Sequence, residues 1–225
     1  SASGGGDNDT IFGGAGLDTL VGDAGADSLW GGDGNDSISG GADNDILSGE
    51  AGNDTIDGGD GNDFVYGGDG DDSLSGGAGG DFITGGLGAD QIDGGAEFDA
   101  VSYADATRAA YIDLAQPANN AYAAAGDTFA NVEGFLLTSR NDQFYGADQT
   151  VIVAGLGGDD ILFGSTQSDI FVGGAGGDYM DGGASLDSAY YSDAGAGVVI
   201  NRLANGQNTG DAAGDYYVSI EGYVL

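Results

Sequence analysis

Aspartate returns at every ninth residue through residues 9–99. Starting at Gly4, eleven nine-residue units follow one another without a gap. The sixth position of these units holds Asp9, Asp18, Asp27, Asp36, Asp45, Asp54, Asp63, Asp72, Asp81, Asp90 and Asp99. If the units stack, each carboxylate lies near another, and two carboxylates about 5 Å apart repel by about 3 kcal/mol at an effective dielectric of about 20. A cation bound between them replaces this repulsion by attraction, so the pattern predicts columns of cation sites.

The chemistry of the available ligands favours one cation. The chain has no His and no Cys, and these are the ligands that Zn²⁺ prefers. Ca²⁺ takes about six to eight oxygen ligands at about 2.3–2.6 Å in flexible geometry, whereas Mg²⁺ gives up its waters reluctantly. We therefore expect Ca²⁺, with up to about nine ions between the turns of residues 4–102.

Each unit has the pattern G-G-x-G-x-D-x-U-x, where U is a large apolar residue, as in GGAGLDTLV (13–21) and GGDGNDFVY (58–66). Glycine tolerates a positive φ, which allows a tight turn to direct several carbonyl groups at one point. The last three residues alternate outward, inward and outward, as in a short strand. The glycines predicted to line the cation sites are Gly13, Gly14, Gly16, Gly31, Gly32, Gly34, Gly58, Gly59, Gly61, Gly67, Gly68, Gly70, Gly76, Gly77, Gly79, Gly85, Gly86 and Gly88.

Two units are expected to form one coil of 18 residues, so that alternate units stack and the aspartates form two columns. Stacked strands would lie about 4.8 Å apart. Four turns depart from the pattern, because Asp7 and Asp43 replace the fourth-position glycine and Asp23 and Glu50 replace the second. We expect altered ligation there, above all at Glu50.

The nonapeptide pattern resembles that of the RTX, or haemolysin-type calcium-binding, repeat family over residues 4–102 and 137–190. The resemblance implies an all-β fold, a right-handed parallel β-roll. It also implies that each Ca²⁺ lies between stacked turns, held by aspartates of both turns and by carbonyls of the glycine-rich segments. Proteins of this family are secreted by bacteria through the type I route, so the resemblance implies a secreted, extracellular or cell-surface protein.

The period stops at residue 103 and resumes less faithfully at residue 137. In the second block Asp142, Asp160 and Asp178 form one column, and the alternate column has Val151 where Asp belongs. We expect about two ions here, between the turns of Asp142 and Asp160 and of Asp160 and Asp178. None is expected between units 146–154 and 164–172.

Residues 94–137 reappear as 182–225 at a constant offset, as in GGAEFD and GGASLD. We therefore predict four parts: a β-roll at 4–102, a non-repeat β module at 103–136, a second roll at 137–190 and a second copy of the module at 191–225. The chain is interpreted as a fragment of a longer array. Seven acids in the two non-repeat modules are predicted to be structural or to bind an extra Ca²⁺. They are Asp105, Asp113, Asp127, Glu133, Asp193, Asp215 and Glu221.

The composition excludes several partners and activities. With 38 acidic residues, three arginines and a formal charge of −35, the chain lacks the basic patches that bind nucleic acid or anionic membranes. No segment resembles a transmembrane helix or a signal peptide. Without His or Cys the usual nucleophile–base pairs are missing, so we do not expect an enzyme.

One predicted sheet carries aromatic residues on its outer face, with Trp30, Phe64 and Tyr66 as candidate ligand-binding residues. Such a stripe stacks on sugar rings or docks a partner in some proteins. The alternative is packing against residues 103–136 or against another module of the parent protein.

The predicted core is thin, with one large apolar residue per unit from Ile11 to Val101. We therefore expect the array to be disordered without Ca²⁺ and to fold in the millimolar Ca²⁺ outside cells. The predicted function is a calcium-folded structural module that assists the secretion of a larger bacterial protein. The alternatives are an adhesin or carbohydrate-binding module and an accessory array of a secreted enzyme.

Overall fold

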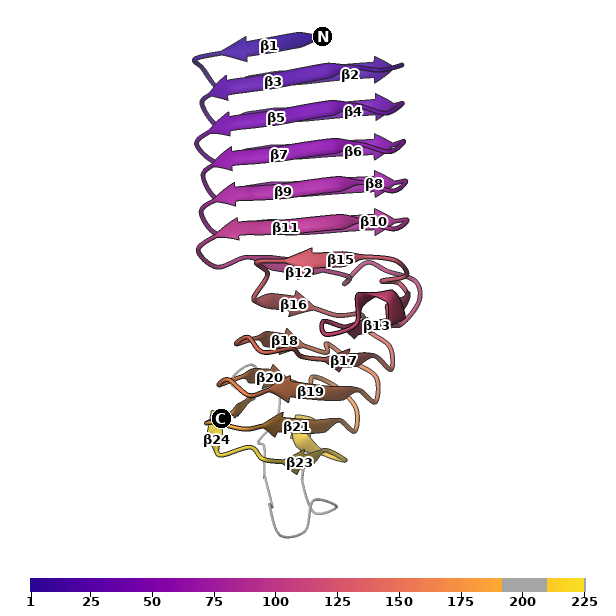
Figure 1. Ribbon diagram of the computed structural model, residues 1–225, viewed down its shortest axis with the longest axis vertical. Helices are drawn as coiled ribbons and strands as arrows, with labels where there is room; N and C mark the ends of the chain where they lie inside the picture. The colour runs from indigo at the N-terminus through magenta and orange to yellow at the C-terminus, as the bar shows by residue number, and fades with distance from the viewer. Residues whose placement is uncertain (192–209, 225) are drawn as a thin grey trace. The chain divides into compact units, whose positions relative to one another are not determined.

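The computed structural model describes residues 1–191 and 210–224 and is almost entirely β (Figure 1). The chain forms two compact units, Ser1–Ser102 with Gly126–Val132, and Tyr103–Ala125 with Glu133–Leu225. In the described part of the chain, no helix has the length and apolar character needed to cross a membrane.

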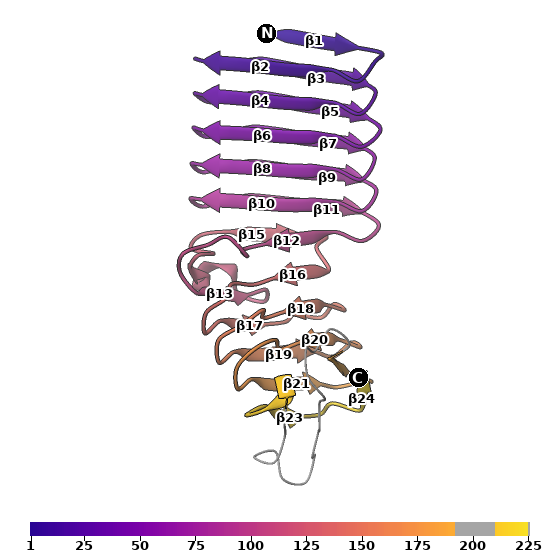
Figure 2. The ribbon, with the colours of Figure 1, turned by 180° about the vertical axis from the view of Figure 1, so that it is seen from behind.

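The first unit is a solenoid of two parallel sheets, and Figure 2 shows it from the side opposite to that of Figure 1. One sheet contains β1 (Ala2–Gly5), β3 (Thr19–Ala24), β5 (Ser37–Ala42), β7 (Thr55–Asp60), β9 (Ser73–Ala78), β11 (Gln91–Ala96) and β15 (Thr128–Ala130). The other contains β2 (Thr10–Ala15), β4 (Ser28–Asp33), β6 (Ile46–Ala51), β8 (Phe64–Asp69), β10 (Phe82–Leu87) and β12 (Ala100–Ser102). The parallel β-roll predicted from the repeat is thereby confirmed.

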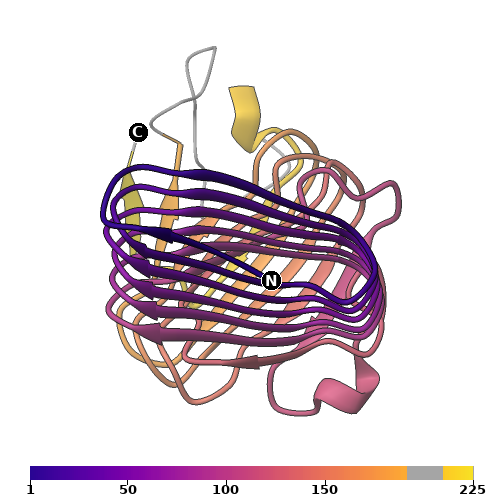
Figure 3. The same ribbon diagram turned by 90° about the horizontal axis from the view of Figure 1, so that it is seen from above.

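Strand pairing keeps the 18-residue register, since Ile38 pairs with Ile56 and Ile56 with Leu74. Viewed along the stack, the coils of this unit lie over one another as flattened rings (Figure 3). Most strands of the first unit are six residues long and extend into the first three residues of the next repeat. The turn between strands is therefore shorter than the sequence predicts.

The core of the first unit is as thin as predicted. One apolar side chain per unit is at most 2% exposed, from Leu20 through Val101, whereas Ile11 in the first coil is half-buried. The other inward position is the first glycine of each unit, such as Gly22 and Gly31, which is also buried. Two facing sheets thus bury one large side chain and one glycine in alternation.

The second unit is also built from parallel sheets. One contains β13 (Ala110–Asp113), β14 (Ala121–Tyr122), β17 (Gln143–Tyr145), β19 (Ile161–Ser165), β21 (Tyr179–Gly183) and β23 (Tyr216–Val218). The other contains β16 (Gly134–Leu136), β18 (Ile152–Ala154), β20 (Ile170–Val172), β22 (Ser188–Tyr190) and β24 (Gly222–Val224). The described residues of this unit also include two short 3-10 helices, η1 (Pro117–Asn119) and η3 (Gly210–Ala212), and β14 pairs with β13 in the antiparallel sense.

Residues 103–136 do not form a unit of their own. Strand β15 pairs with β11 in the first unit, whereas β13 and β16 belong to the second. The amide of Asp90 bonds to the side chain of Asp127, 37 residues later, where the other coils use a spacing of 18. The repeat is therefore interrupted by an insertion within one coil. Asp178 and Asp215 have the same spacing of 37 residues; residues 192–209 of the second copy lie outside the described residues.

Two of the irregular turns show how the roll accepts a side chain at a position where the repeat has glycine. Glu50 and Asp43 take φ values of 74° and 75°, whereas Gly32 and Gly41 take 106° and 121°. The Glu50 turn therefore keeps a left-handed backbone despite its side chain, at a cost of about 1–2 kcal/mol.

Gly14 and Gly32 provide a matched test of this stacking. Both have positive φ and both hold the second position of a unit, but a Cβ at Gly14 meets nothing within 4 Å, whereas a Cβ at Gly32 would lie 1.9 Å from the carbonyl oxygen of Gly14. We expect Gly14→Ala to lower the free energy of unfolding by about 1 kcal/mol and Gly32→Ala by about 1–2 kcal/mol more. Denaturant unfolding in saturating Ca²⁺ measures both, and equal losses would contradict the close-approach argument.

Candidate metal sites

The predicted aspartate columns exist, and each carboxylate bonds to the preceding coil. The backbone N–H of Asp27 donates to Oδ1 of Asp45 at 2.7 Å, and that of Asp45 donates to Oδ1 of Asp63 at 2.8 Å. The other column repeats this contact, with Asp36 donating to Asp54 at 2.7 Å. From Asp27 to Asp99 these side chains are at most 3% exposed. Each carboxylate thus has one oxygen fixed by a backbone donor.

The second oxygen of most column carboxylates has no hydrogen-bond partner. These buried, unpaired Oδ2 atoms belong to Asp9, Asp27, Asp36, Asp45, Asp54, Asp63, Asp72, Asp81, Asp90, Asp99, Asp160, Asp178 and Asp187. A buried acceptor without a donor costs about 1–3 kcal/mol, and more when it is charged. An oxygen of this kind on every coil fits a cation ligand.

The first-position glycine leaves space beside this oxygen. A Cβ at Gly22 would lie 2.3 Å from Oδ2 of Asp27 and 2.4 Å from the carbonyl oxygen of Gly40 on the next coil. The same two kinds of oxygen converge beside Gly58, where Asp63 and Gly76 supply them at 2.4 and 2.3 Å. A side chain at either glycine would fill the space beside the carboxylate.

The donor set matches Ca²⁺ rather than a softer metal. Among the described residues no three His, Cys, Asp or Glu side chains gather as a metal cluster. Each site therefore draws on few carboxylates, and backbone carbonyls must supply the remaining ligands. Hard oxygen ligands in a flexible turn suit Ca²⁺. Which carbonyls of the predicted glycines bind the ion, and how many ions bind, stay predictions.

Burial also changes the acidity of the columns. Desolvation, together with neighbouring carboxylates, raises the pKa of Asp63 and Asp72 to about 6, of Asp90 and Asp178 to about 7, and of Asp160 to about 8. The backbone N–H bond to each carboxylate lowers its pKa but does not offset burial. The metal-free columns therefore resist full ionisation near neutral pH.

A second ladder, which the sequence analysis missed, runs along the fifth position of the units. The N–H of Ala26 donates to Oδ1 of Asn8 at 3.1 Å, and that of Asn62 donates to Oδ1 of Asn44 at 2.9 Å. These exposed side chains reach toward the next coil, opposite to the column aspartates. The recurring Asn immediately before Asp is the sequence signal that indicates this ladder.

The acids outside the predicted columns have different positions. Asp127 and Asp215 occupy column positions, since they accept the N–H groups of Asp90 and Asp178 at 2.9 Å. Glu221 also continues a column, because its Oε2 accepts the N–H of Asp187 at 3.0 Å. Asp113 instead organises its own loop by accepting from Gln116 and Asn119. Asp193 lies outside the described residues.

The aromatic candidates do not form one continuous platform. Trp30 stacks on Phe12 with ring centroids 4.8 Å apart and planes 13° apart, so one face of the indole is covered. Phe64 lies in another row beside Phe82, at 6.0 Å. Tyr66 is 38% exposed, and Ser48 separates it from Trp30 in the strand register. Ligand binding by these three residues stays a prediction.

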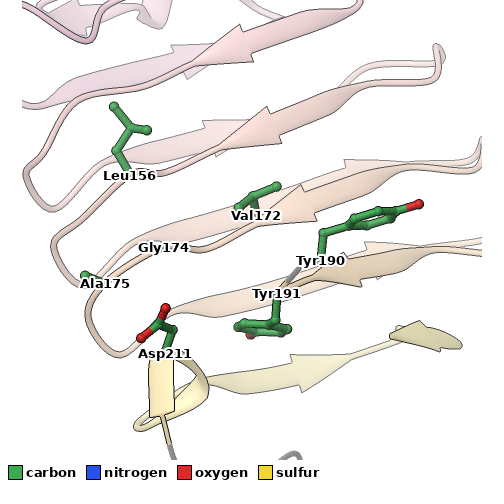
Figure 4. Close-up of a pocket in the computed structure, with 7 residues that line it drawn as sticks. All are labelled: Leu156, Val172, Gly174, Ala175, Tyr190, Tyr191 and Asp211. Atoms are coloured by element: carbon green, nitrogen blue, oxygen red, sulfur yellow. The ribbon is translucent and has the colours of Figure 1, made fainter. Parts of the chain in front are cut away.

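A small pocket lies in the second unit (Figure 4). Its walls are Leu156, Val172, Gly174, Ala175, Tyr190, Tyr191 and Asp211. Asp211 is the one acidic side chain in this lining.

Comparison with known families agrees with this geometry. The family model of the RTX calcium-binding nonapeptide repeat, in its four-copy form, matches residues 3–38, 30–65, 39–74, 66–101 and 154–188. No curated protein matches the chain. The matched residues make up more than half of the chain. They include every aspartate named above whose Oδ2 has no hydrogen-bond partner. This chain belongs to the RTX calcium-binding repeat family, as a β-roll whose repeats form a structural calcium-binding module.

Proposed function

We propose that this module folds when it binds Ca²⁺ outside the cell, and that it assists the type I secretion of a larger bacterial protein. The observation that carries the proposal is the buried, unpaired Oδ2 atom found on successive coils of both columns. Without a cation, folding buries a row of carboxylates in which Oδ1 gains a backbone donor but Oδ2 loses its water and gains none. With Ca²⁺, the same oxygens become ligands.

The cellular setting follows from the affinity expected for such sites. Extracellular calcium modules bind with dissociation constants of about 10⁻⁴–10⁻³ M. At the low Ca²⁺ level inside a cell the chain would stay unfolded and exportable, and it would fold on arrival in millimolar Ca²⁺. RTX repeats occur in secreted bacterial proteins, which supports this route. Binding of glycans, other modules or a neighbouring enzyme domain stays a prediction without a specific observation in its favour.

A calcium titration tests the folding step. We expect the far-UV circular dichroism of the calcium-stripped chain to change from coil to β in one cooperative transition near millimolar Ca²⁺. Mg²⁺ at the same concentration should not produce it, because Mg²⁺ keeps its waters. A chain that is already fully β in chelator would contradict the proposal.

Asp63 and Asp60 provide a matched pair of carboxylates. Asp63 is buried with a bare Oδ2, whereas Asp60 is exposed and lies outside the columns. We expect Asp63→Asn to remove one site, which at about ten times its dissociation constant lowers the free energy of unfolding by about 1.4 kcal/mol. Asp60→Asn, with the same change in charge, should leave the free energy of unfolding at this Ca²⁺ concentration unchanged. Chemical unfolding at fixed Ca²⁺ distinguishes the two, and equal effects would assign the calcium response to net charge alone.

The raised pKa values predict opposite effects of acid with and without Ca²⁺. In the metal-free state burial holds the pKa values of column carboxylates such as Asp63, Asp90 and Asp160 above their unfolded values, at about 6, 7 and 8. Their contribution to stability is therefore fully present below about pH 4 and is lost as the pH rises through the folded pKa values. We expect acidification of the calcium-stripped chain from about pH 8 to about pH 5 to increase its β content.

With Ca²⁺ present, protons compete for the same oxygens, so the calcium midpoint should rise over the same pH range. Circular dichroism at a series of pH values, with and without Ca²⁺, measures both trends. A metal-free chain whose β content falls on acidification would show that the buried columns do not control its folding.

A further inference from the structure

Most column carboxylates fall into two classes according to which group contacts their second oxygen. Within the described part of the chain, thirteen of them have an Oδ2 without a hydrogen-bond partner. In the second unit Asp142, Asp169 and Asp215 instead accept hydrogen bonds from protein donors at Oδ2. All three are at most 1% exposed, so the difference is not one of burial.

Thr138 supplies the donors for Asp142. Its backbone N–H donates to Oδ2 at 2.9 Å, and its hydroxyl lies 2.8 Å from Oδ1 and 3.0 Å from Oδ2. Ala110 donates its N–H to Oδ1 at 2.6 Å. The hydroxyl oxygen of Thr138 also accepts the N–H of Arg140 at 3.1 Å, which closes a tight turn. Both oxygens of Asp142 are thereby satisfied without a metal.

Ser165 has the same role for Asp169. Its N–H donates to Oδ2 at 2.7 Å, while the N–H of Val151 donates to Oδ1 at 2.8 Å. The Ser165 hydroxyl accepts the N–H of Gln167 and donates to the carbonyl of Gln149, both at 2.9 Å. The turn of Ser165 is therefore closed in the same way as that of Thr138.

The two turns share a sequence feature. Thr138 and Ser165 stand at the second position of their units, and Arg140 and Gln167 at the fourth, where the consensus has glycine. None of these four residues has a positive φ, whereas Gly174 and Gly176 in the Asp178 turn have φ values of 99° and 141°. A hydroxyl-closed turn thus replaces the left-handed glycine turn.

Asp215 accepts hydrogen bonds from two tyrosine hydroxyls. Its Oδ1 accepts the N–H of Asp178 at 2.9 Å, and its Oδ2 accepts the hydroxyls of Tyr191 and, at 3.2 Å, Tyr217. The two hydroxyls also lie 2.6 Å apart. Burial raises the pKa of both tyrosines, so their hydroxyls stay protonated and can donate.

We infer that protein donors take the place of the cation at three turns of the second unit, with the N–H and hydroxyl of Thr138 serving Asp142, the N–H of Ser165 serving Asp169, and the hydroxyls of Tyr191 and Tyr217 serving Asp215. These three turns bind no Ca²⁺. The inference rests on the proposed calcium sites at the bare turns, and it differs from the sequence-based prediction of an ion between the turns of Asp142 and Asp160. The second position of the unit then distinguishes the turns of Asp142 and Asp169, because it has a positive φ at every turn with a bare Oδ2, whereas Thr138 and Ser165 do not.

Counting bound Ca²⁺ by native mass spectrometry of the full chain tests the inference. Asp160 has a bare Oδ2 and lies in the same column as Asp142, one coil later. We expect Asp160→Asn to lose at least one ion relative to the unmodified chain and Asp142→Asn to lose none. Loss of an ion from Asp142→Asn would overturn the inference.

A gain-of-site variant covers the case in which Asp142→Asn fails to fold. Gly164 already holds the space found at cation turns, because a Cβ there would lie 2.4 Å from Oδ2 of Asp169 and 2.5 Å from the carbonyl of Gly182. Ser165→Gly with Gln167→Gly restores the consensus turn and removes no carboxylate, so we expect one additional ion.

An unchanged count in this double variant would overturn the inference, whereas the proposed function would stand. An unmodified chain that binds no Ca²⁺ would overturn the proposed function and the inference together.

Discussion

Like charges stacked in a thin, dry roll are the constraint on which the rest of this structure depends. Most coils bury carboxylates that have one oxygen bonded to a backbone N–H and a second oxygen without a hydrogen-bond partner. A buried charge with an unsatisfied oxygen is unfavourable on its own, and its neighbours of the same sign add to the cost. The raised pKa values of Asp90 and Asp160 reflect the same cost in the metal-free state. A hard cation would offset desolvation and repulsion together, which is the physical basis for the proposal that Ca²⁺ controls the folding of the roll.

Glycine connects this electrostatic problem to the backbone. The first-position glycine leaves the space in which carboxylate and carbonyl oxygens converge, and it faces the core where a second apolar side chain would otherwise lie. The space that admits the ion therefore also keeps the core thin. Hydrophobic burial cannot be increased in these coils without filling the space beside the carboxylates.

The repeat itself could be predicted from the sequence because a nine-residue period determines both the strand register and the alignment of the aspartates. The inward residues from Leu20 to Val101 follow from that same period. The insertion before Asp127 could not be predicted, because strand β15 returns to the first sheet only through tertiary pairing with β11. The donors on Asp142 and Asp215 were also missed: Thr138 lies in the same unit as Asp142 but replaces the consensus glycine, and Tyr191 reaches Asp215 from a segment outside the repeat. Sequence patterns identified the carboxylates but not the groups that meet their second oxygens.

The second unit shows what changes when a roll of this kind depends less on cations. Its inward positions include Phe135, Phe144 and Phe171, which are at most 2% exposed and larger than the Leu, Ile and Val of the first unit, beside smaller residues such as Val153 and Leu162. Its outer face carries aromatic pairs such as Tyr145 with Phe163 and Tyr179 with Tyr216, and such pairs contribute about 0.5–1.5 kcal/mol each. The turns that lose glycine and gain hydroxyl donors occur in this same unit. Larger core side chains and protein donors thus appear together where bare carboxylates become fewer, as expected if each coil must be stabilised either by a cation at its turn or by more side-chain packing and hydrogen bonding within the chain.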